Sequence, residues 1–522
     1  MTENSKIAKA TGIVGSATLL SRILGYVRDM ALAWFFGAGL TSDAFFVAFR
    51  IPNLLRRLFA EGSLSIAFVP IFSDYLEKEG KEEAFRFAGS ALKFLAVALA
   101  LLVVAGFFFA PVIVRVFAPG FAGDPEKLAL TVAMTRIMFP YIFFIGLVAL
   151  CMGILNVLGH FVAPALAPVF LNIAMIGSVF LISPVMAEPV TGLAIGVLIG
   201  GALQLGLQAP FLLKQGISLS QKIKLFHPGL KKVGRLMLPT ILGAAAYQVN
   251  ILIGTLLSSL LPEGSVSYLY YADRLTQFPL GIFAIALATA ILPSLSRQAA
   301  AGQIKEAGET FSYAMRFVFF ITLPAMAGMI VLREPIVALL FKRGAFDVMA
   351  VKSTAHALLC YLAGLWAFSA VRIAIAAFYA LKDTRTPVKM AVISIGVNVA
   401  LGILLMGPMG HGGLALATSL SSILNLFLLV RALGPKLGFS GWGFLTTSIF
   451  KTIAASLIMG GAVYGTSLSL IPPSGGDAMG GLLLGLGASI AVGLAVYVLS
   501  AVILKSPEMN IIFSMVSKAI KK

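Results

Sequence analysis

Charge is scarce in this chain of 522 residues: Asp, Glu, Lys and Arg together make up 11% of it, whereas 59% is hydrophobic and the mean hydropathy is +0.99. Soluble domains carry about 25% charged residues, so the composition excludes a chain that is mainly water-soluble. The stretch from Phe94 to Val114 has no charge at all. Because about 20 consecutive apolar residues cross a bilayer as a helix, this scarcity predicts a membrane protein.

Cysteine and histidine are also rare, with two and four residues. Cys151 and Cys360 lie in apolar stretches, so neither a disulfide framework nor a metal site is expected. The histidines are scattered, and no ATPase phosphate-binding loop or other catalytic constellation stands out. The sequence therefore predicts neither an enzyme nor a bound metal or cofactor.

The apolar stretches are continuous, as in membrane helices, and do not alternate as barrel strands do. Some are long enough for a hairpin of two spans, since Glu188 is the only formal charge between Arg136 and Lys214. Counting in this way predicts an all-α polytopic membrane protein with about 14 transmembrane helices. The expected hairpin turns lie near residues 159, 183, 407 and 471.

Acidic residues are outnumbered: there are 21 Asp and Glu against 39 Lys and Arg, a formal net charge of +18. Most basic residues gather in alternate loops, whereas the turns near residues 38, 186, 263, 410 and 475 have no Lys or Arg. This bias predicts a multi-pass membrane protein with both termini in the cytoplasm. One expected outer loop, with Lys342, Arg343 and Lys352, departs from the rule. Basic residues dispersed in this way argue against a nucleic-acid partner.

The chain also contains an internal repeat. Pro111, Phe117 and Gly120 recur 224 residues later (335 minus 111), within two similar segments, Ala110 to Phe121 and Glu334 to Phe346. Six expected spans separate the copies, so both have the same orientation in the membrane, and parallel six-helix repeats are a transporter plan. The expected domains are an N-lobe over residues 1–216, a basic cytoplasmic linker over 217–235, a C-lobe over 236–434, and two C-terminal helices with a cytoplasmic tail over 435–522.

Arginines inside apolar stretches are the most informative residues. Arg22 and Arg28 lie in the first stretch, and the second contains Arg50, Arg56 and Arg57. A guanidinium stays charged, so at membrane depth it is costly unless it faces water, a carboxylate or an anion. Its repeated use predicts a polar cavity for a negatively charged ligand.

In the second stretch, helical spacing groups the polar residues. Arg50, Asn53 and Arg57 share one helix face. Glu61 follows Arg57 by four residues and is placed to pair with it. A purely structural ion pair among Arg56, Arg57 and Glu61 is the alternative interpretation. The positive charge left over favours an anion site.

In the first stretch, Arg22 and Arg28 do not share a face of a straight helix, but a bend at Gly25 would bring both to one cavity. Asp29 follows Arg22 by seven residues and is placed to orient it. Snorkelling of one arginine at a helix end is the alternative.

The second lobe contributes fewer candidates. Arg274 is the repeat counterpart of Arg50, and Arg372 is open between packing and function. Three further polar residues near the same helices are candidates for the cavity lining: Asp43, Ser267 and Gln277.

Several segments resemble the MurJ (MviN) family: SRILGYVRD, GAGLTSDAFFVAFRIPNLLRRLFAEGSLSIAFVPIF, APGF, YYADR with the following FPLG, and LKDTRTPVK. These are lipid II flippases of bacterial peptidoglycan synthesis, in the multidrug/oligosaccharidyl-lipid/polysaccharide exporter superfamily. The resemblance runs from about residue 8 to the C-terminus, and PNLLRRLFAEG is its most specific segment. It implies two lobes around a cationic cavity, alternating access, and a groove formed by the last two helices.

Carried over by motif, the resemblance implies substrate-binding roles for Arg22, Arg28, Asp43, Asn53, Arg56, Arg57, Ser267 and Arg274. The further candidates for the cavity lining are Asp29, Arg50, Glu61, Gln277 and Arg372. Gln277 departs from relatives that carry an acidic residue there. The implied partners are lipid II, an undecaprenyl-diphosphate-linked disaccharide-pentapeptide, and membrane lipids, with a monomer as the functional unit. No cofactor is implied, and the membrane potential or an ion gradient is the expected driving force.

Two other functions stay open on the sequence alone. One is export of another undecaprenyl-linked sugar or a drug within the same superfamily, against which the PNLLRR and YADR motifs argue. The other is an enzyme that acts on lipid-linked sugars, against which the missing catalytic motifs argue. The glycine-rich last two spans are consistent with close helix packing or with a groove for a lipid chain.

Overall fold

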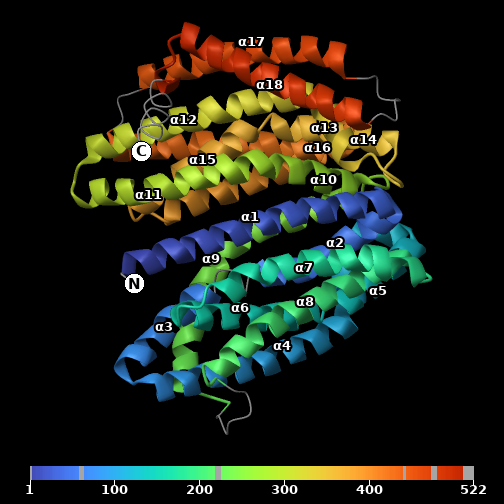
Figure 1. Ribbon diagram of the computed structural model, residues 1–522, viewed down its shortest axis with the longest axis vertical. Coiled ribbons are helices and arrows are strands. Elements are labelled where there is room, and N and C mark those ends of the chain that lie inside the picture. Colours follow the sequence, from blue (N-terminus) through green and yellow to red (C-terminus); the bar gives the residue numbers. More distant parts are fainter. Residues whose placement is uncertain (1–2, 58–63, 218–224, 439–441, 472–478, 510–522) are drawn as a thin grey trace. The chain divides into compact units, whose positions relative to one another are not determined.

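The computed structural model describes residues 3–57, 64–217, 225–438, 442–471 and 479–509, and all regular structure in these ranges is helical (Figure 1). Nine described helices are long and apolar enough to cross a membrane, and the pair Val348–Leu362 and Leu365–Ala380, bent by 43°, would make a tenth. The all-α polytopic fold is therefore confirmed, whereas the count of about 14 spans stays a prediction.

The chain folds as two compact units. The first comprises Met1–Ser267 with Arg343–Phe346, and the second comprises Tyr268–Lys342 with Asp347–Lys522. The lobe boundaries expected from the repeat stay a prediction. The helices of the first unit are α1 (Glu3–Phe36), α2 (Leu40–Leu55), α3 (Ser65–Lys78), α4 (Lys81–Phe117), η2 (Pro119–Gly123), α5 (Pro125–Met138), α6 (Tyr141–Val157), α7 (Val162–Leu181), η3 (Ser183–Val185), α8 (Pro189–Lys214) and α9 (Pro228–Ser259).

The helix α10 (Ser265–Pro279) begins in the first unit and continues into the second. The remaining helices of the second unit are η4 (Leu280–Ala284), α11 (Ile285–Ala300), α12 (Ile304–Val331), α13 (Arg333–Phe341), α14 (Val348–Leu362), α15 (Leu365–Ala380), α16 (Arg385–Leu437), α17 (Trp442–Leu470) and α18 (Met479–Ile503).

The long element α16 contains the hairpin turn expected near residue 407. Gly410 leaves the helical conformation, with φ +55° and ψ −134°, a region that favours glycine. A Cβ on Gly413 would lie 2.2 Å from the carbonyl oxygen of Leu405. Residues eight positions apart in a straight helix are separated by about 12 Å along its axis, so the chain reverses here. The turns expected near residues 159 and 183 also fall in breaks, before and after α7.

Two loops related by the repeat contact helix ends reciprocally in the first unit. Gly120, after α4, donates its amide to Ser259 Oγ at the end of α9 (3.2 Å). Gly344, its repeat counterpart, packs on Trp34 near the end of α1, where the Ala345 amide donates to the Trp34 carbonyl (2.9 Å). Ser259 and Trp34 are themselves 225 positions apart (259 minus 34), within one residue of the repeat offset. The two contacts are therefore related by the pseudo-symmetry of the repeat.

We expect Gly120→Ala to destabilise this arrangement. Its Cβ would lie 2.0 Å from the Ser259 carbonyl oxygen, and both atoms are fixed by the backbone. Overpacking of this kind costs about 1–3 kcal/mol. In detergent, Gly120→Ala should unfold at a lower temperature than the wild type. Gly123→Ala is the matched control, because an added Cβ there meets nothing within 4 Å, and equal melting temperatures for both variants would contradict the close contact.

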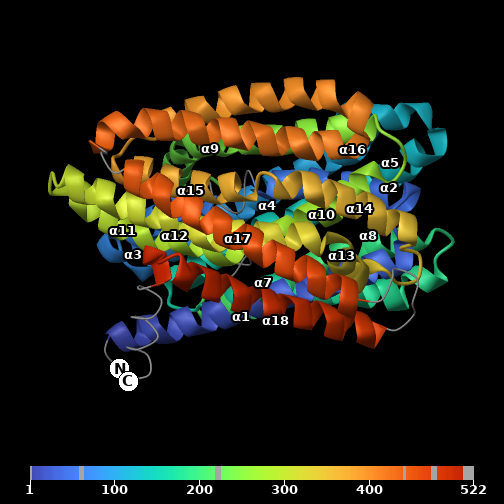
Figure 2. The same cartoon turned by 90° about the horizontal axis from the view of Figure 1, so that it is seen from above.

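Buried polar contacts attach the last two helices to α12. Arg316 of α12 donates to Glu508 Oε1 (3.1 Å), which also accepts from the hydroxyl of Ser448 on α17 (2.8 Å). Tyr497 of α18 donates its hydroxyl to the Phe320 carbonyl of α12 (2.6 Å). Figure 1 and Figure 2 both show α17 and α18 side by side next to α12. The two C-terminal helices are thus packed as part of the second unit.

An ion pair outside the spans makes a pH-dependent contribution. Asp383, between α15 and α16, pairs with Lys436 and accepts from the amide (3.0 Å) and the hydroxyl (2.7 Å) of Thr386. The bond from Lys436, followed by those from Thr386, lowers the pKa of Asp383 below its ordinary value of 3.8.

A lowered pKa means that the folded protein favours the carboxylate. The contribution is therefore fully present above pH 3.8 and is lost as the pH falls through the lowered pKa. We expect Asp383→Asn to melt below the wild type at pH 6, and the difference to shrink below pH 3.8. Thermal unfolding across this range provides the test, and a difference that stays constant would rule out an ionic origin.

Candidate functional site

Arg28 of α1 is buried, with 8% of its surface exposed. Its Nε and Nη2 donate to Asp29 Oδ1 at 3.0 and 2.7 Å, and its Nη1 donates to Asn172 Oδ1 of α7 at 3.2 Å. Asn172 also donates its amide to the Ser21 carbonyl of α1 (3.1 Å). One side chain of α7 therefore holds both the backbone of α1 and the guanidinium of Arg28.

Asp29 contacts Arg28, which its spacing did not suggest. It is fully buried and accepts from Arg28, and its expected orientation of Arg22 stays a prediction. Neighbours in a helix normally point apart, but an arginine side chain is long enough to curl back onto an adjacent carboxylate. The helix α1 continues through Gly25, and Arg22 is exposed. A joint substrate role of Arg22 and Arg28 stays a prediction.

The end of α2 is a polar turn. Asn53 accepts from Arg56 Nε (3.1 Å) and donates to the Phe49 carbonyl (3.0 Å), so it orients this guanidinium. Asn53 and Arg56 are half-buried, and Arg57 is exposed. Glu61, the expected partner of Arg57, lies outside the described residues. The substrate roles of this turn stay a prediction.

Arg50 lies nearly two turns before Arg56 on α2 and contacts α9. It is half-buried, and its Nη1 donates to Thr255 Oγ1 at 2.5 Å. The Thr255 hydroxyl in turn donates to the Ile251 carbonyl (2.9 Å). One contact of Arg50 is therefore with a neutral hydroxyl of α9.

Asp43, in the first turn of α2, is 1% exposed and is hydrogen-bonded on both oxygens. Oδ2 accepts from Lys127 Nζ (2.9 Å) and from the Gly264 amide (2.8 Å). Oδ1 accepts from the amide (2.9 Å) and the hydroxyl (2.7 Å) of Ser267. Because Gly264 and Ser267 flank the start of α10, the carboxylate caps that helix and its ion pair with Lys127 balances the charge.

The two repeats cap each other at this point. Asp43 of α2 caps the start of α10, while Glu263, just before α10, accepts from the Leu40 amide at the start of α2 (2.6 Å). Asp43 and Ser267 are 224 residues apart, which is the repeat offset. Positions that are counterparts in the repeat thus contact one another. This arrangement explains Asp43 and Ser267 as structural partners, and a substrate role for them stays a prediction.

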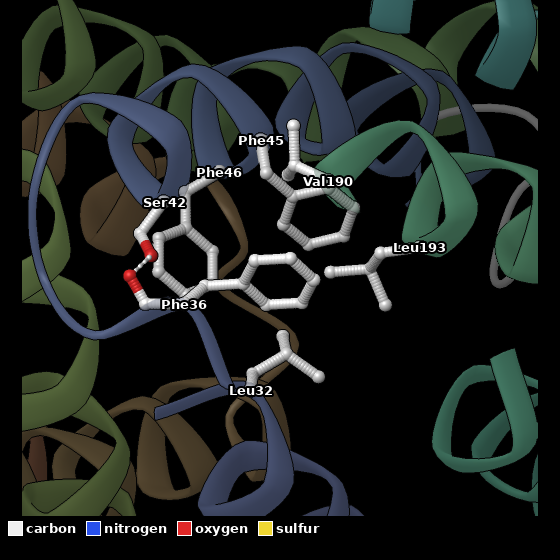
Figure 3. Close-up of a pocket in the computed structure, with 7 residues that line it drawn as sticks. All are labelled: Leu32, Phe36, Ser42, Phe45, Phe46, Val190 and Leu193. Carbon is white, nitrogen blue, oxygen red and sulfur yellow. Dashed lines mark hydrogen bonds between the residues drawn. The ribbon is translucent and has the colours of Figure 1, made fainter. Parts of the chain in front are cut away.

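Aromatic side chains fill the space next to this cap, between the end of α1 and the starts of α2 and α8 (Figure 3). Ser42 donates its hydroxyl to the carbonyl of Phe36 (3.3 Å) at the edge of the cluster. The space among these side chains is too small to hold a water molecule. The residues of the cluster are Leu32, Phe36, Ser42, Phe45, Phe46, Val190 and Leu193.

Three predicted site residues lie in the second unit. Arg274 is half-buried on α10, and Arg372 is exposed on α15. Gln277 is exposed and donates to Asp273 Oδ2 at 2.5 Å, so at this position an amide orients a neighbouring carboxylate. The substrate roles of these residues stay predictions.

Three contact residues escape prediction from the sequence. Asn172 and Thr255 lie in apolar runs where no charge marks them. Lys127 had a detectable signal, because Asp43 in an apolar stretch needs a counterion.

The charge balance of α1 and α2 favours an anion. From residue 22 to residue 57 the chain has five arginines and two aspartates. Of the two aspartates, Asp43 pairs with Lys127 and Asp29 pairs with Arg28. Arginines outnumber aspartates in this part of the sequence, and guanidinium groups are suited to phosphate oxygens.

Comparison with known proteins identifies the family of this chain. Residues 32–472 match the family described as lipid II flippase MurJ. The probable lipid II flippase MurJ of Vibrio cholerae is 39% identical over 440 residues, which is 83% of this chain and 84% of the relative. The lipid II flippase MurJ of Burkholderia cenocepacia is 37% identical over 458 residues, covering 86% and 88% of the two chains.

Solved structures of membrane transporters are also similar to this chain. A lipid II flippase MurJ in an inward closed conformation has a TM-score of 0.79 at 29% identity, with 94% of this chain and 98% of that chain covered. An inward-facing multidrug resistance MATE family transporter of the MOP superfamily has a TM-score of 0.65 at 17% identity, with 80% and 94% covered. At 17% identity, the match to the MATE family transporter shows a shared fold only.

Fold and site together define a multi-pass helical membrane protein with the architecture found in the MOP superfamily. Its buried arginine is held between two helices of one unit. Within this class the chain belongs to the lipid II flippase MurJ family. The family resemblance of the sequence motifs is confirmed, and the protein is a transporter and not an enzyme.

Proposed function

We propose that this chain flips lipid II from the cytoplasmic to the outer leaflet of the cytoplasmic membrane, for cell wall synthesis. Membership of the family supplies the substrate. The observation that supports the site is the buried guanidinium of Arg28, which Asp29 and Asn172 hold in one orientation. An ordered cation at membrane depth is costly; the Asp29 carboxylate offsets that cost in this conformation, and a guanidinium group is also suited to phosphate oxygens.

In this proposal, Arg28 binds the diphosphate together with Arg22, Arg56 and Arg57. Guanidinium–phosphate hydrogen bonds are charge-assisted and often bidentate, so they fix the position of the headgroup as well as attract it. The disaccharide-pentapeptide occupies a polar cavity while the prenyl chain stays in lipid. Alternating access arises from rocking of one repeat against the other, as in other transporters built from parallel repeats.

The driving force in the proposal is the membrane potential or an ion gradient. A cell interior that is negative favours outward movement of an anionic headgroup by about 2.3 kcal/mol per charge per 100 mV. The proposed orientation has both termini in the cytoplasm, the proposed unit is a monomer, and the cycle needs no bound cofactor. Reporter fusions should read outside at residues 186 and 410 and inside at residues 225 and 435.

Replacement of the native flippase tests the function in cells. In a bacterial strain depleted of its own lipid II flippase, this chain should restore growth and the accessibility of lipid II at the outer face. The chemical structure of lipid II should be unchanged, which separates transport from an enzyme that modifies it. Insertion of the protein without any recovery of outer lipid II would contradict the proposal.

A further inference from the structure

The face of α8 that packs on α7 changes character along its length. Gly192, Gly196 and Gly200 stand at every fourth position, and an added Cβ at each would come within 2.0–2.6 Å of an atom of η3 or α7. The next two positions of the same series are Gln204 and Gln208. Close glycine contact with α7 therefore gives way to the amide of Gln204. Gln208 lies seven residues, or two helical turns, after Gly201, whose added Cβ would meet Tyr141 and Phe144 of α6.

These amides are not satisfied by the protein. Gln208 is fully buried, and among the described residues neither its amide oxygen nor its amide nitrogen has a hydrogen-bond partner. Gln204 donates to the Ala167 carbonyl of α7 (3.0 Å), but its oxygen is buried and likewise lacks a partner in the described part of the chain. The conclusion does not depend on which way round the Gln208 amide is placed, because both its oxygen and its nitrogen lack a partner among the described residues. Buried polar groups are almost always hydrogen-bonded, to protein or to ordered water, so we expect a partner for these amides other than the described residues.

The chemistry of the orphaned atoms identifies the ligand. Gln208 presents a donor and an acceptor together, whereas a cation would satisfy only the oxygen and an anion only the N–H groups. Across the described residues there is also no group of three or more His, Cys, Asp or Glu side chains that could hold a metal ion. A water molecule both donates and accepts, and buried waters typically bridge such groups.

We propose that Gln204 and Gln208 form a buried water-binding site toward the Lys214 end of α8. Four residues of helix rise about 6 Å, close to the distance that one water spans when it is bonded to two groups. One or two waters thus connect Gln208 to the Gln204 oxygen. Gln204 also donates to Ala167 of α7, the helix whose Asn172 holds Arg28.

Leucine substitutions test the proposal on the purified full-length protein. Gln208→Leu removes hydrogen bonds to water but none to the protein, so its melting temperature should fall by less than that of a variant that also loses a protein partner. Gln204→Leu is the matched control on the same face, and it should melt lower because it loses the bond to Ala167. If the melting temperature of Gln208→Leu fell as far as that of Gln204→Leu, the proposal would be overturned, because such a drop would reveal a direct protein partner of Gln208.

A high-resolution structure of the wild type provides a second arm that does not depend on how the variants fold. Density for water within about 3.2 Å of both Gln208 amide atoms is expected. A cation at this place, or a direct bond from Gln208 to a carbonyl of α7, would overturn the proposal. Neither arm measures lipid II transport, so failure here is distinguishable from failure of the proposed flippase function.

Discussion

Replacing Arg28 with alanine is expected to abolish lipid II flipping, with a loss of at least about 100-fold in rate, because loss of one partner of a buried charged contact costs about 2–5 kcal/mol. The guanidinium is held by Asp29 and Asn172 in a single orientation, so neither a mobile neighbour nor water can take its place. Arg28→Lys should also fail, because an ammonium does not reproduce a planar, bidentate donor set. Flipping in proteoliposomes, with protein amount and insertion measured in parallel, is the readout.

The single variant has a second effect that must be separated from the first. It leaves the buried Asp29 carboxylate without the guanidinium that pairs with it, which destabilises the fold. The double variant Arg28→Ala/Asp29→Asn removes both charges and should recover stability but not transport. Arg86→Ala, at an exposed arginine of α4, is the control and should flip normally. Wild-type flipping by the double variant would remove the diphosphate role from Arg28.

The largest effect on stability is expected for Asp43→Ala. It leaves Lys127, whose side chain is 9% exposed, without its counterion, and it removes the cap of α10. Breaking a buried ion pair in this way costs about 3–5 kcal/mol, to which loss of a cap adds about 1 kcal/mol. The free energy of unfolding, measured by denaturant titration in detergent, should fall accordingly.

Two further variants identify the cause. Asp43→Leu/Lys127→Met removes both charges from the buried site and should regain much of the lost stability, because replacing a buried ion pair by apolar residues is often neutral. Asp74→Ala breaks the Asp74–Lys78 pair, whose side chains are 66% and 72% exposed, and should change the stability by only about 0–1 kcal/mol. Similar losses for Asp43→Ala and Asp74→Ala would mean that burial does not govern these pairs.

The membrane class, the helical fold and the repeat were predictable from the sequence because each depends on patterns of many residues. Uninterrupted apolar stretches predict the membrane-spanning helices, and Pro and Gly residues at matching positions indicate the repeat. The turn near residue 407 was visible for the same reason, since GPMGHGG interrupts an apolar run and Gly410 takes up the required positive φ.

Side-chain partners were harder to predict, because they depend on which helices become neighbours. Asp29 was assigned by spacing to Arg22, yet it bonds to Arg28, and the third member of that group, Asn172, comes from a helix 144 residues away. Lys127 and Asp43 are separated by 84 residues, and no local pattern joins them. The expected pairing of Arg57 with Glu61 involves a residue outside the described ranges.

Transport by the purified chain tests the central claim most directly. Wild type and Arg28→Ala/Asp29→Asn would be reconstituted into proteoliposomes with fluorescent lipid II in the inner leaflet, and its arrival at the outer face would be measured with a membrane-impermeant reagent. We expect the wild type to bring lipid II to the outer face and the double variant to match protein-free vesicles. Wild-type vesicles that are indistinguishable from protein-free vesicles would contradict the assignment of this chain as a lipid II flippase.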